Sequence, residues 1–212
     1  MITHNLPVLL EFPYEVKPLE RGYSGQTLYV NVQSKAAAAK PVTDDMRETF
    51  VGGRGFDLWL LWHAVNDDTQ WDDPENEVVI SSGPCGGITQ YPGSGKSIAA
   101  TVSPLTGIPI DSNAGGHCGP YLKFAGWDAI EIQGNAESEV IVLIDAPEGK
   151  VQILEAPDDC PTDTHVLGHW LNETLAESEE DRQLLSFVTA WPGSEHSYMG
   201  CLNFSLYDRK RP

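Results

Sequence analysis

The chain has 212 residues, enough for one large domain or two small ones, and 41% of them are hydrophobic. Its 6 tryptophans and 20 glycines indicate a packed globular domain with many loops, and they exclude a disordered or repetitive chain. The 31 acidic and 13 basic residues give a formal net charge of −18. This charge argues against binding to nucleic acid or to anionic lipid, because both require clustered cations.

The N-terminus carries no recognisable secretory signal, since no basic segment precedes the apolar stretch 6–12 and Pro7 and Glu11 interrupt it. No apolar run approaches the ~20 residues that span a bilayer. We therefore expect a cytoplasmic protein. The 4 cysteines include no Cys-x-x-Cys pair, which fits neither a disulfide framework nor a complete iron–sulfur or zinc site. If the protein works with a cluster, the ligands of that cluster lie elsewhere.

Residues 1–24 are aperiodic and are predicted to form an extended arm that wraps a surface or a partner, before a domain over residues 25–212. Thr43, followed by two acidic residues, predicts the N-cap of a short helix. Alternating or buried-type apolar patterns predict strands. The expected strands are Gln26–Val32, Glu77–Ser81, Ser97–Val102, Ala129–Gln133, Val140–Asp145, Val151–Glu155, Leu184–Thr189 and Gly200–Leu206, with further helices at Phe56–Val65 and Thr162–Glu177. This mixture predicts an α+β fold.

The stretch from Gly83 to Gly119 is dense in Gly, Pro, Ser and Thr. A long glycine-rich stretch inside a compact domain is typical of backbone that lines a ligand. No arrangement of Ser, His, Asp or Cys in the chain indicates a nucleophile or an acid/base pair, so no catalytic residue is predicted. His117 and Cys118 are more typical of packing, although they gain interest if this stretch faces a cofactor.

Two patterns resemble common motifs but lack an essential part. Gly93–Ser97 is similar to a phosphate-binding loop, yet Gln90 stands where that loop requires glycine, and the residues that follow favour a strand over a helix. His165 and His169 have the spacing of a zinc pair, but Val166 replaces the glutamate of a zinc protease and no third ligand is evident. A glycine-rich backbone beside a lysine still suits a phosphate-bearing ligand of another kind.

Six short segments, most of them rich in glycine, follow one another in a characteristic order and spacing. They are Val51–Phe56, Ser82–Pro84, Pro92–Lys96, Ser103–Gly107, Asp111–Gly116 and Leu122–Ala129. In this order they resemble the N-terminal domain of the aldehyde ferredoxin oxidoreductase family, whose members are tungsten or molybdenum enzymes with paired pterins. The resemblance covers roughly residues 25–211.

The resemblance implies a β-rich, pterin-binding base of two sheets related by a pseudo-twofold axis, with a few flanking helices. It places Asn113 where a backbone carbonyl binds the magnesium ion that bridges the two pterin phosphates. The cofactor-binding residues it implies are Gly95, Lys96, Asn113, Ala114, Gly115, Gly116 and Arg209. Lys96 stands where the family has an arginine, so it keeps the charge but loses the planar fork of the guanidinium.

The resemblance also implies a function. It indicates a cofactor-binding subunit of a tungsten- or molybdenum-pterin oxidoreductase that acts on an aldehyde/carboxylate couple or performs a related low-potential reduction. Because family members are about three times longer on the domain-size scale, we expect a heteromer. Its partner would carry the [4Fe-4S] cluster, the substrate pocket and the electron route to ferredoxin, and the chain alone would be inactive. Two alternatives stay open: a fragment or gene remnant, and a non-catalytic assembly or scaffold protein.

Overall fold

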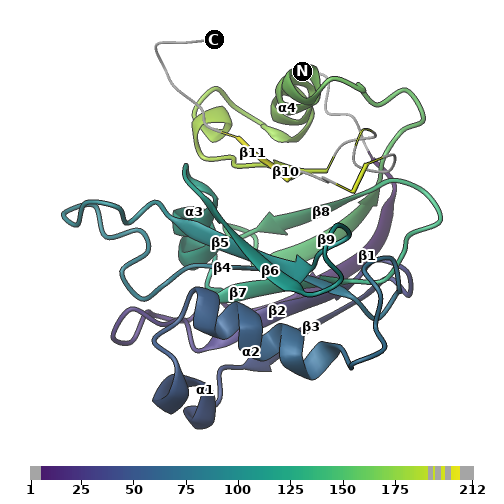
Figure 1. Cartoon of the computed structure of the whole chain (residues 1–212). Coiled ribbons are helices and arrows are strands. Elements are labelled where there is room, and N and C mark those ends of the chain that lie inside the picture. Colours follow the sequence, from purple (N-terminus) through teal and green to yellow (C-terminus); the bar gives the residue numbers. More distant parts are fainter. Residues whose placement is uncertain (1–5, 191–192, 194–196, 199–201, 206–212) are drawn as a thin grey trace.

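A computed structural model of the chain describes residues 6–190, 193, 197–198 and 202–205 (Figure 1). Its main element is a six-stranded sheet with the order β3-β2-β7-β4-β5-β6, in which β2 and β7 run parallel and the other neighbours antiparallel. The strands are β2 (Gln26–Asn31), β3 (Ala36–Pro41), β4 (Glu77–Ser81), β5 (Ser97–Val102), β6 (Pro109–Ala114) and β7 (Ala129–Gln133).

A second, three-stranded sheet has the order β1-β9-β8, and a short pair of strands, β10 and β11, forms a third sheet. Their bounds are β1 (Val8–Pro13), β8 (Val140–Asp145), β9 (Lys150–Glu155), β10 (Val188–Thr189) and β11 (Asn203–Phe204). Leu28 and Ile80 of the six-stranded sheet and Val151 and Ile153 of β9 belong to one buried cluster. The main core therefore lies between the two larger sheets.

Helices α1 (Asp44–Thr49) and α2 (Arg54–Ala64) lie together beside the six-stranded sheet, below it in Figure 1. Phe56, Leu60 and Leu61 of α2 pack with Val79 and Ala129 in a second buried cluster. This cluster covers the face of the sheet that is turned away from the main core. The other helices are α3 (Cys118–Phe124), α4 (Thr164–Leu175) and a short 3-10 helix, Asp181–Gln183. No helix in the described ranges is long and apolar enough to cross a membrane.

The α+β class is confirmed, and β4, β5, β7 and β8 have the predicted bounds. Thr43 is the N-cap of α1, where its side chain accepts a hydrogen bond of 3.2 Å from the backbone N–H of Met46. Five elements were not predicted: β1, β3, β6, α3 and the 3-10 helix. The strand expected at Leu184–Thr189 was largely wrong, because only Val188–Thr189 is extended. Part of the strand expected at Gly200–Leu206 lies outside the described residues.

Residues 1–24, predicted as an extended arm, contain β1, which pairs antiparallel with β9. Just beyond β1, the hydroxyl of Tyr14 donates to the carbonyl of Ala125 at 2.9 Å, and its ring centroid lies 4.6 Å from that of Trp127. This part of the segment therefore packs on the chain's own core. The boundary between arm and domain and the pseudo-twofold relation of the sheets stay predictions.

Candidate cofactor-binding site

The β5–β6 hairpin brings the two predicted binding segments together. In its register Ser97 lies opposite Ala114 and Ile98 lies opposite Asn113. Lys96 comes directly before this ladder and Gly115 directly after it, so the two residues meet at the same end. The Nζ atom of Lys96 is 4.0 Å from the position that a Cβ atom on Gly115 would occupy. Six predicted residues, Gly95, Lys96 and Asn113–Gly116, thus lie together at this end of the hairpin.

Asn113 lies on β6, which is the edge strand of the six-stranded sheet in the described part of the chain. At the other end of the hairpin the N–H of Ser103 donates to the carbonyl of Ile108 at 2.9 Å. Opposed residues in an antiparallel ladder alternate between hydrogen-bonded and non-hydrogen-bonded pairs. Counting back from Ser103, Asn113 belongs to a non-hydrogen-bonded pair, so its N–H and carbonyl point away from β5. The carbonyl is therefore available at an open edge.

The fold requires some glycines at and near the site but not others. A Cβ atom on Gly95 would lie 2.9 Å from the carbonyl oxygen of Gly116, and one on Gly119 would lie 2.9 Å from the carbonyl oxygen of Lys96. Gly116 has a φ of 103°, which favours glycine. Gly115 has neither a positive φ nor a neighbour closer than Lys96. A glycine without an internal reason, beside an exposed lysine and an open carbonyl, fits close approach of an external phosphate group.

The loop before β5 positions Lys96 through its own backbone. The N–H of Gly87 donates to the carbonyl of Ser94 at 3.0 Å, and the N–H of Lys96 donates to the carbonyl of Gly93 at 3.3 Å. Gly93 has a φ of 86°, a conformation that glycine adopts readily. The chain then enters β5 at Ser97, so it forms a strand where a nucleotide-binding loop would open a helix. The prediction against a nucleotide site is consistent with this geometry.

His117 and Cys118 lie beside the site at the start of α3. The ring of His117 stacks on Tyr121 with a centroid separation of 5.5 Å. Burial raises the pKa of the Cys118 thiol to about 11, so the thiol is protonated at neutral pH and is a poor nucleophile and a poor metal ligand. The structure therefore gives both residues packing contacts within the chain. Arg209, the remaining predicted binding residue, lies outside the described residues.

The two histidines with zinc-pair spacing, His165 and His169, are exposed on α4. Over the described ranges, no three His, Cys, Asp or Glu side chains gather in a way that could hold a metal ion.

The segment Leu122–Ala129, which also carries the family resemblance, has a structural role. Lys123 and Asp128 form an ion pair in which both side chains are fully buried. The carboxylate of Asp128 also accepts hydrogen bonds from the N–H groups of Ser24 at 3.0 Å and Gly25 at 2.8 Å. This network joins the turn between α3 and β7 to the start of β2.

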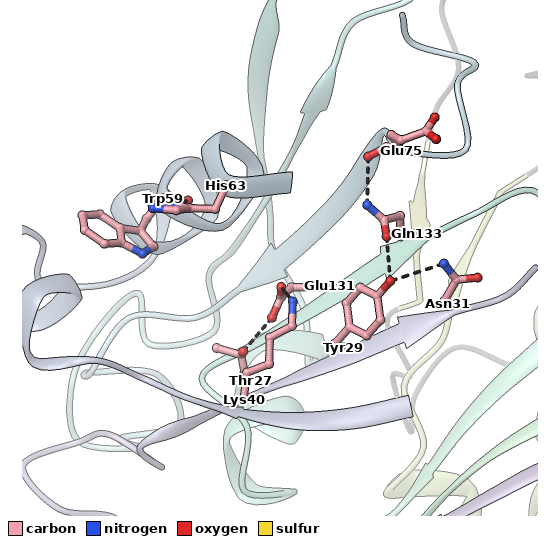
Figure 2. Close-up of polar contacts among 9 residues, drawn as sticks. All are labelled: Thr27, Tyr29, Asn31, Lys40, Trp59, His63, Glu75, Glu131 and Gln133. Carbon is pink, nitrogen blue, oxygen red and sulfur yellow. Dashed lines mark hydrogen bonds and ion pairs between the residues drawn. The ribbon is translucent and has the colours of Figure 1, made fainter. Parts of the chain in front are cut away.

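A row of polar side chains on the α2 side of the sheet was not predicted (Figure 2). Glu131 accepts from the hydroxyl of Thr27 at 2.6 Å and from Nζ of Lys40 at 2.5 Å. The hydroxyl of Tyr29 donates to Gln133 at 2.6 Å. Because these groups satisfy one another, the row is typical of an internal polar network. The alternation of polar residues in Gln26–Asn31 was the signal in the sequence that could have indicated it.

Comparison with known proteins identifies the class. The model of the family "Aldehyde ferredoxin oxidoreductase, N-terminal domain" matches residues 27–205. The tungsten-containing aldehyde ferredoxin oxidoreductase of Pyrococcus furiosus is 32% identical over 177 residues, which are 82% of this chain and 28% of that relative. The enzyme of the same name from Pyrococcus horikoshii is 34% identical over 135 residues, 64% of this chain and 22% of the relative. The chain belongs to the aldehyde ferredoxin oxidoreductase family.

Two further similarities widen the range of chemistry in the relatives. A protein of Pyrococcus furiosus named "Aliphatic sulfonate oxidoreductase, WOR-like subunit" is 32% identical over 125 residues, 58% of this chain and 20% of that relative. The solved "Active site complex BamBC of Benzoyl Coenzyme A reductase in complex with 1,5 Dienoyl-CoA" is similar with a TM-score of 0.70 and 25% identity, over 80% of this chain and 24% of that one. The chain spans about a fifth to just over a quarter of the length of these relatives.

Proposed function

We propose that this chain is the cofactor-binding subunit of a tungsten- or molybdenum-pterin oxidoreductase. Membership of the family supports this proposal, because the relatives named above include tungsten-containing aldehyde ferredoxin oxidoreductases. The observation that carries it is the meeting of Gly95 and Lys96 with Asn113–Gly116 at one end of the β5–β6 hairpin. For the complete enzyme we propose interconversion of an aldehyde and a carboxylate, or a related low-potential reduction.

Each residue of the site has a part in holding the cofactor. Lys96 supplies a positive charge for a pterin phosphate, and Gly115 and Gly116 let that phosphate approach the backbone. The outward carbonyl of Asn113 is an oxygen ligand of the kind that Mg²⁺ prefers. Once bound, the metal–pterin group would supply two-electron redox chemistry. The chain itself contributes binding and orientation through a rigid hairpin.

The rest of the enzyme would come from a partner subunit. We propose that this subunit carries the [4Fe-4S] cluster and the substrate pocket and passes electrons to ferredoxin. One observation supports a partner: the similar solved structure is named as a complex. A ferredoxin is usually acidic, so the net charge of −18 on this chain also favours electron exit through the partner.

The proposal is tested by purifying the tagged full chain from its native host and measuring tungsten, molybdenum and pterin in the complex. Gly115→Val should abolish retention of metal and pterin, because a branched side chain blocks approach to the backbone. Gly168→Val is the matched control, since a Cβ atom at Gly168 on α4 meets nothing within 4 Å. Circular dichroism of both variants checks that they fold.

Full metal and pterin content in Gly115→Val would contradict the site. A wild-type complex without pterin or metal would contradict the function and favour the scaffold alternative. Mass spectrometry of the co-purified proteins identifies the partner, and its absence would contradict the heteromer.

A further inference from the structure

An ion pair joins the first residue of α2 to the strand that carries the proposed site. The guanidinium of Arg54 lies 2.6 Å from a carboxylate oxygen of Asp111 on β6. The side chain of Arg54 is 59% exposed and that of Asp111 is 19% exposed. Exposed pairs of this kind contribute about 0–1 kcal/mol to stability. The pair is therefore weak enough for Arg54 to take a second ligand.

Asp111 stands on the same face of β6 as Asn113. Successive side chains of a strand alternate between its two faces, so residues two apart share a face and lie roughly 6.6 Å apart. Asp111 is opposite Ala100 and Asn113 is opposite Ile98, which places both on the face that α2 covers. The order along this face is thus Arg54 and Asp111, then Asn113, then Gly115 with Lys96 beside it.

This arrangement presents an electrostatic problem for a phosphate. Asp111 puts a carboxylate one strand repeat from Asn113 and two from Gly115, in a chain that already carries a net charge of −18. Like charges at such separations repel, and partial exclusion of water strengthens the repulsion. Lys96 provides a single point charge and no planar fork. A second cation is needed if the hairpin is to hold a phosphate.

We propose that Arg54 is that second cation and contacts a phosphate group of the cofactor while it remains paired with Asp111. The guanidinium has five N–H donors in a fixed fork, so two of them can bind Asp111 while others bind a phosphate oxygen. Arg54 would therefore both neutralise Asp111 and bind the ligand. This inference rests on the proposed function, because it assigns a residue to the same site.

The probe is inorganic pyrophosphate with Mg²⁺, and isothermal titration calorimetry measures its binding to the full chain. Lys96→Ala tests the site itself. Arg54→Ala, Asp111→Asn and the double variant Arg54→Ala/Asp111→Asn test Arg54. Arg47→Ala is the matched control, since Arg47 forms an ion pair of the same 2.6 Å length with Asp44 within α1. Thermal unfolding of each variant checks that it folds.

We expect Lys96→Ala and Arg54→Ala each to weaken binding at least tenfold, and Asp111→Asn to strengthen it. The double variant should bind at least fivefold more weakly than Asp111→Asn alone, because the contact from Arg54 is lost even where there is no carboxylate to neutralise. Equal affinities of these two proteins would overturn the proposed contact, as would equal weakening by Arg47→Ala.

The same titrations separate this inference from the proposed function. Binding that depends on Lys96 but not on Arg54 would overturn the role of Arg54 and leave the phosphate site in place. A wild-type chain that does not bind the probe, or binding that Lys96→Ala leaves unchanged, would contradict the site itself and therefore both proposals.

Discussion

Two segments that carry the family resemblance, Leu122–Ala129 and Asp111–Gly116, differ in what the fold demands of them. Leu122–Ala129 holds the fully buried pair of Lys123 and Asp128 and the fully buried Trp127. Asp111–Gly116 lies at a sheet edge, where Asn113 and Gly115 are exposed. The first segment is explained by packing within the chain. In the second, the fold explains Gly116 through its positive φ and Asp111 through its ion pair, but it explains neither Asn113 nor Gly115. Residues that a fold does not require are the ones that indicate a ligand.

The largest effect should come from breaking the buried pair. Asp128→Ala leaves the Lys123 ammonium without a partner in the core and removes the acceptor for two backbone N–H groups. Loss of one partner of a buried ion pair costs about 3–5 kcal/mol. Urea denaturation measures the change in the free energy of unfolding.

The control is Asp145→Ala, because Asp145 pairs with Lys150 at 3.7 Å and both side chains are partly exposed. Its cost should be about 0–1 kcal/mol. Similar losses in the two variants would show that the buried network contributes no more than a surface pair.

The next effect is a pH dependence of the free energy of unfolding, which comes from the buried Glu77 on β4. Burial, and secondly the neighbouring Glu131, raise the pKa of Glu77 from 4.5 to about 8. A carboxyl group whose pKa is raised by folding holds its proton in the folded state and loses it in the unfolded state between these values. Glu77 therefore makes stability fall as pH rises from 4.5 to about 8, by up to about 1.4 kcal/mol per pH unit.

Glu77→Gln should remove this slope, because an amide does not titrate. The difference between the unfolding free energies of variant and wild type, followed across this range, isolates Glu77 from the other acids. A difference that stays constant with pH would show that Glu77 is already ionised in the folded protein.

A smaller effect should distinguish the two kinds of glycine at the site. Gly95→Ala places a Cβ atom 2.9 Å from the carbonyl oxygen of Gly116, and overpacking of this sort costs about 1–3 kcal/mol. Gly115→Ala meets only Nζ of the exposed Lys96, at 4.0 Å, so its effect should stay within about 0.5 kcal/mol. Thermal unfolding of the ligand-free proteins compares them. A large loss for Gly115→Ala would mean that the fold does require this glycine.

The sequence predicted strands best where the core decides their conformation. β4, β5, β7 and β8 are apolar runs bounded by turn residues, and their bounds were predicted to the residue. β3 contains four alanines, which favour a helix, yet pairing along its whole length with β2 makes it a strand. β6 contains Pro, Asp and Asn and has low strand propensity, and it is extended because β5 pairs with it.

The candidate site could be predicted only in part, because some of its contacts depend on how distant segments pack. The resemblance brought Lys96 and Asn113–Gly116 into one hypothesis, and the register of β5 and β6 supplies the physical basis. The pairing of Arg54 with Asp111 spans 57 positions, and no local pattern selects one acid among the 31 in this chain. Contacts of this kind depend on how α2 crosses the sheet, which the local sequence does not specify.

The smallest effect we expect concerns the side chain of Asn113. If magnesium is bound by the outward backbone carbonyl, Asn113→Ala keeps the ligand atom. The side chain is exposed, so its loss should change stability by less than about 0.5 kcal/mol. Affinity for magnesium pyrophosphate should change less than threefold, whereas Lys96→Ala weakens it at least tenfold. Calorimetry on the full chain compares the two variants. A loss in Asn113→Ala as large as that in Lys96→Ala would show that the side-chain amide, and not the carbonyl of the edge strand, makes the contact.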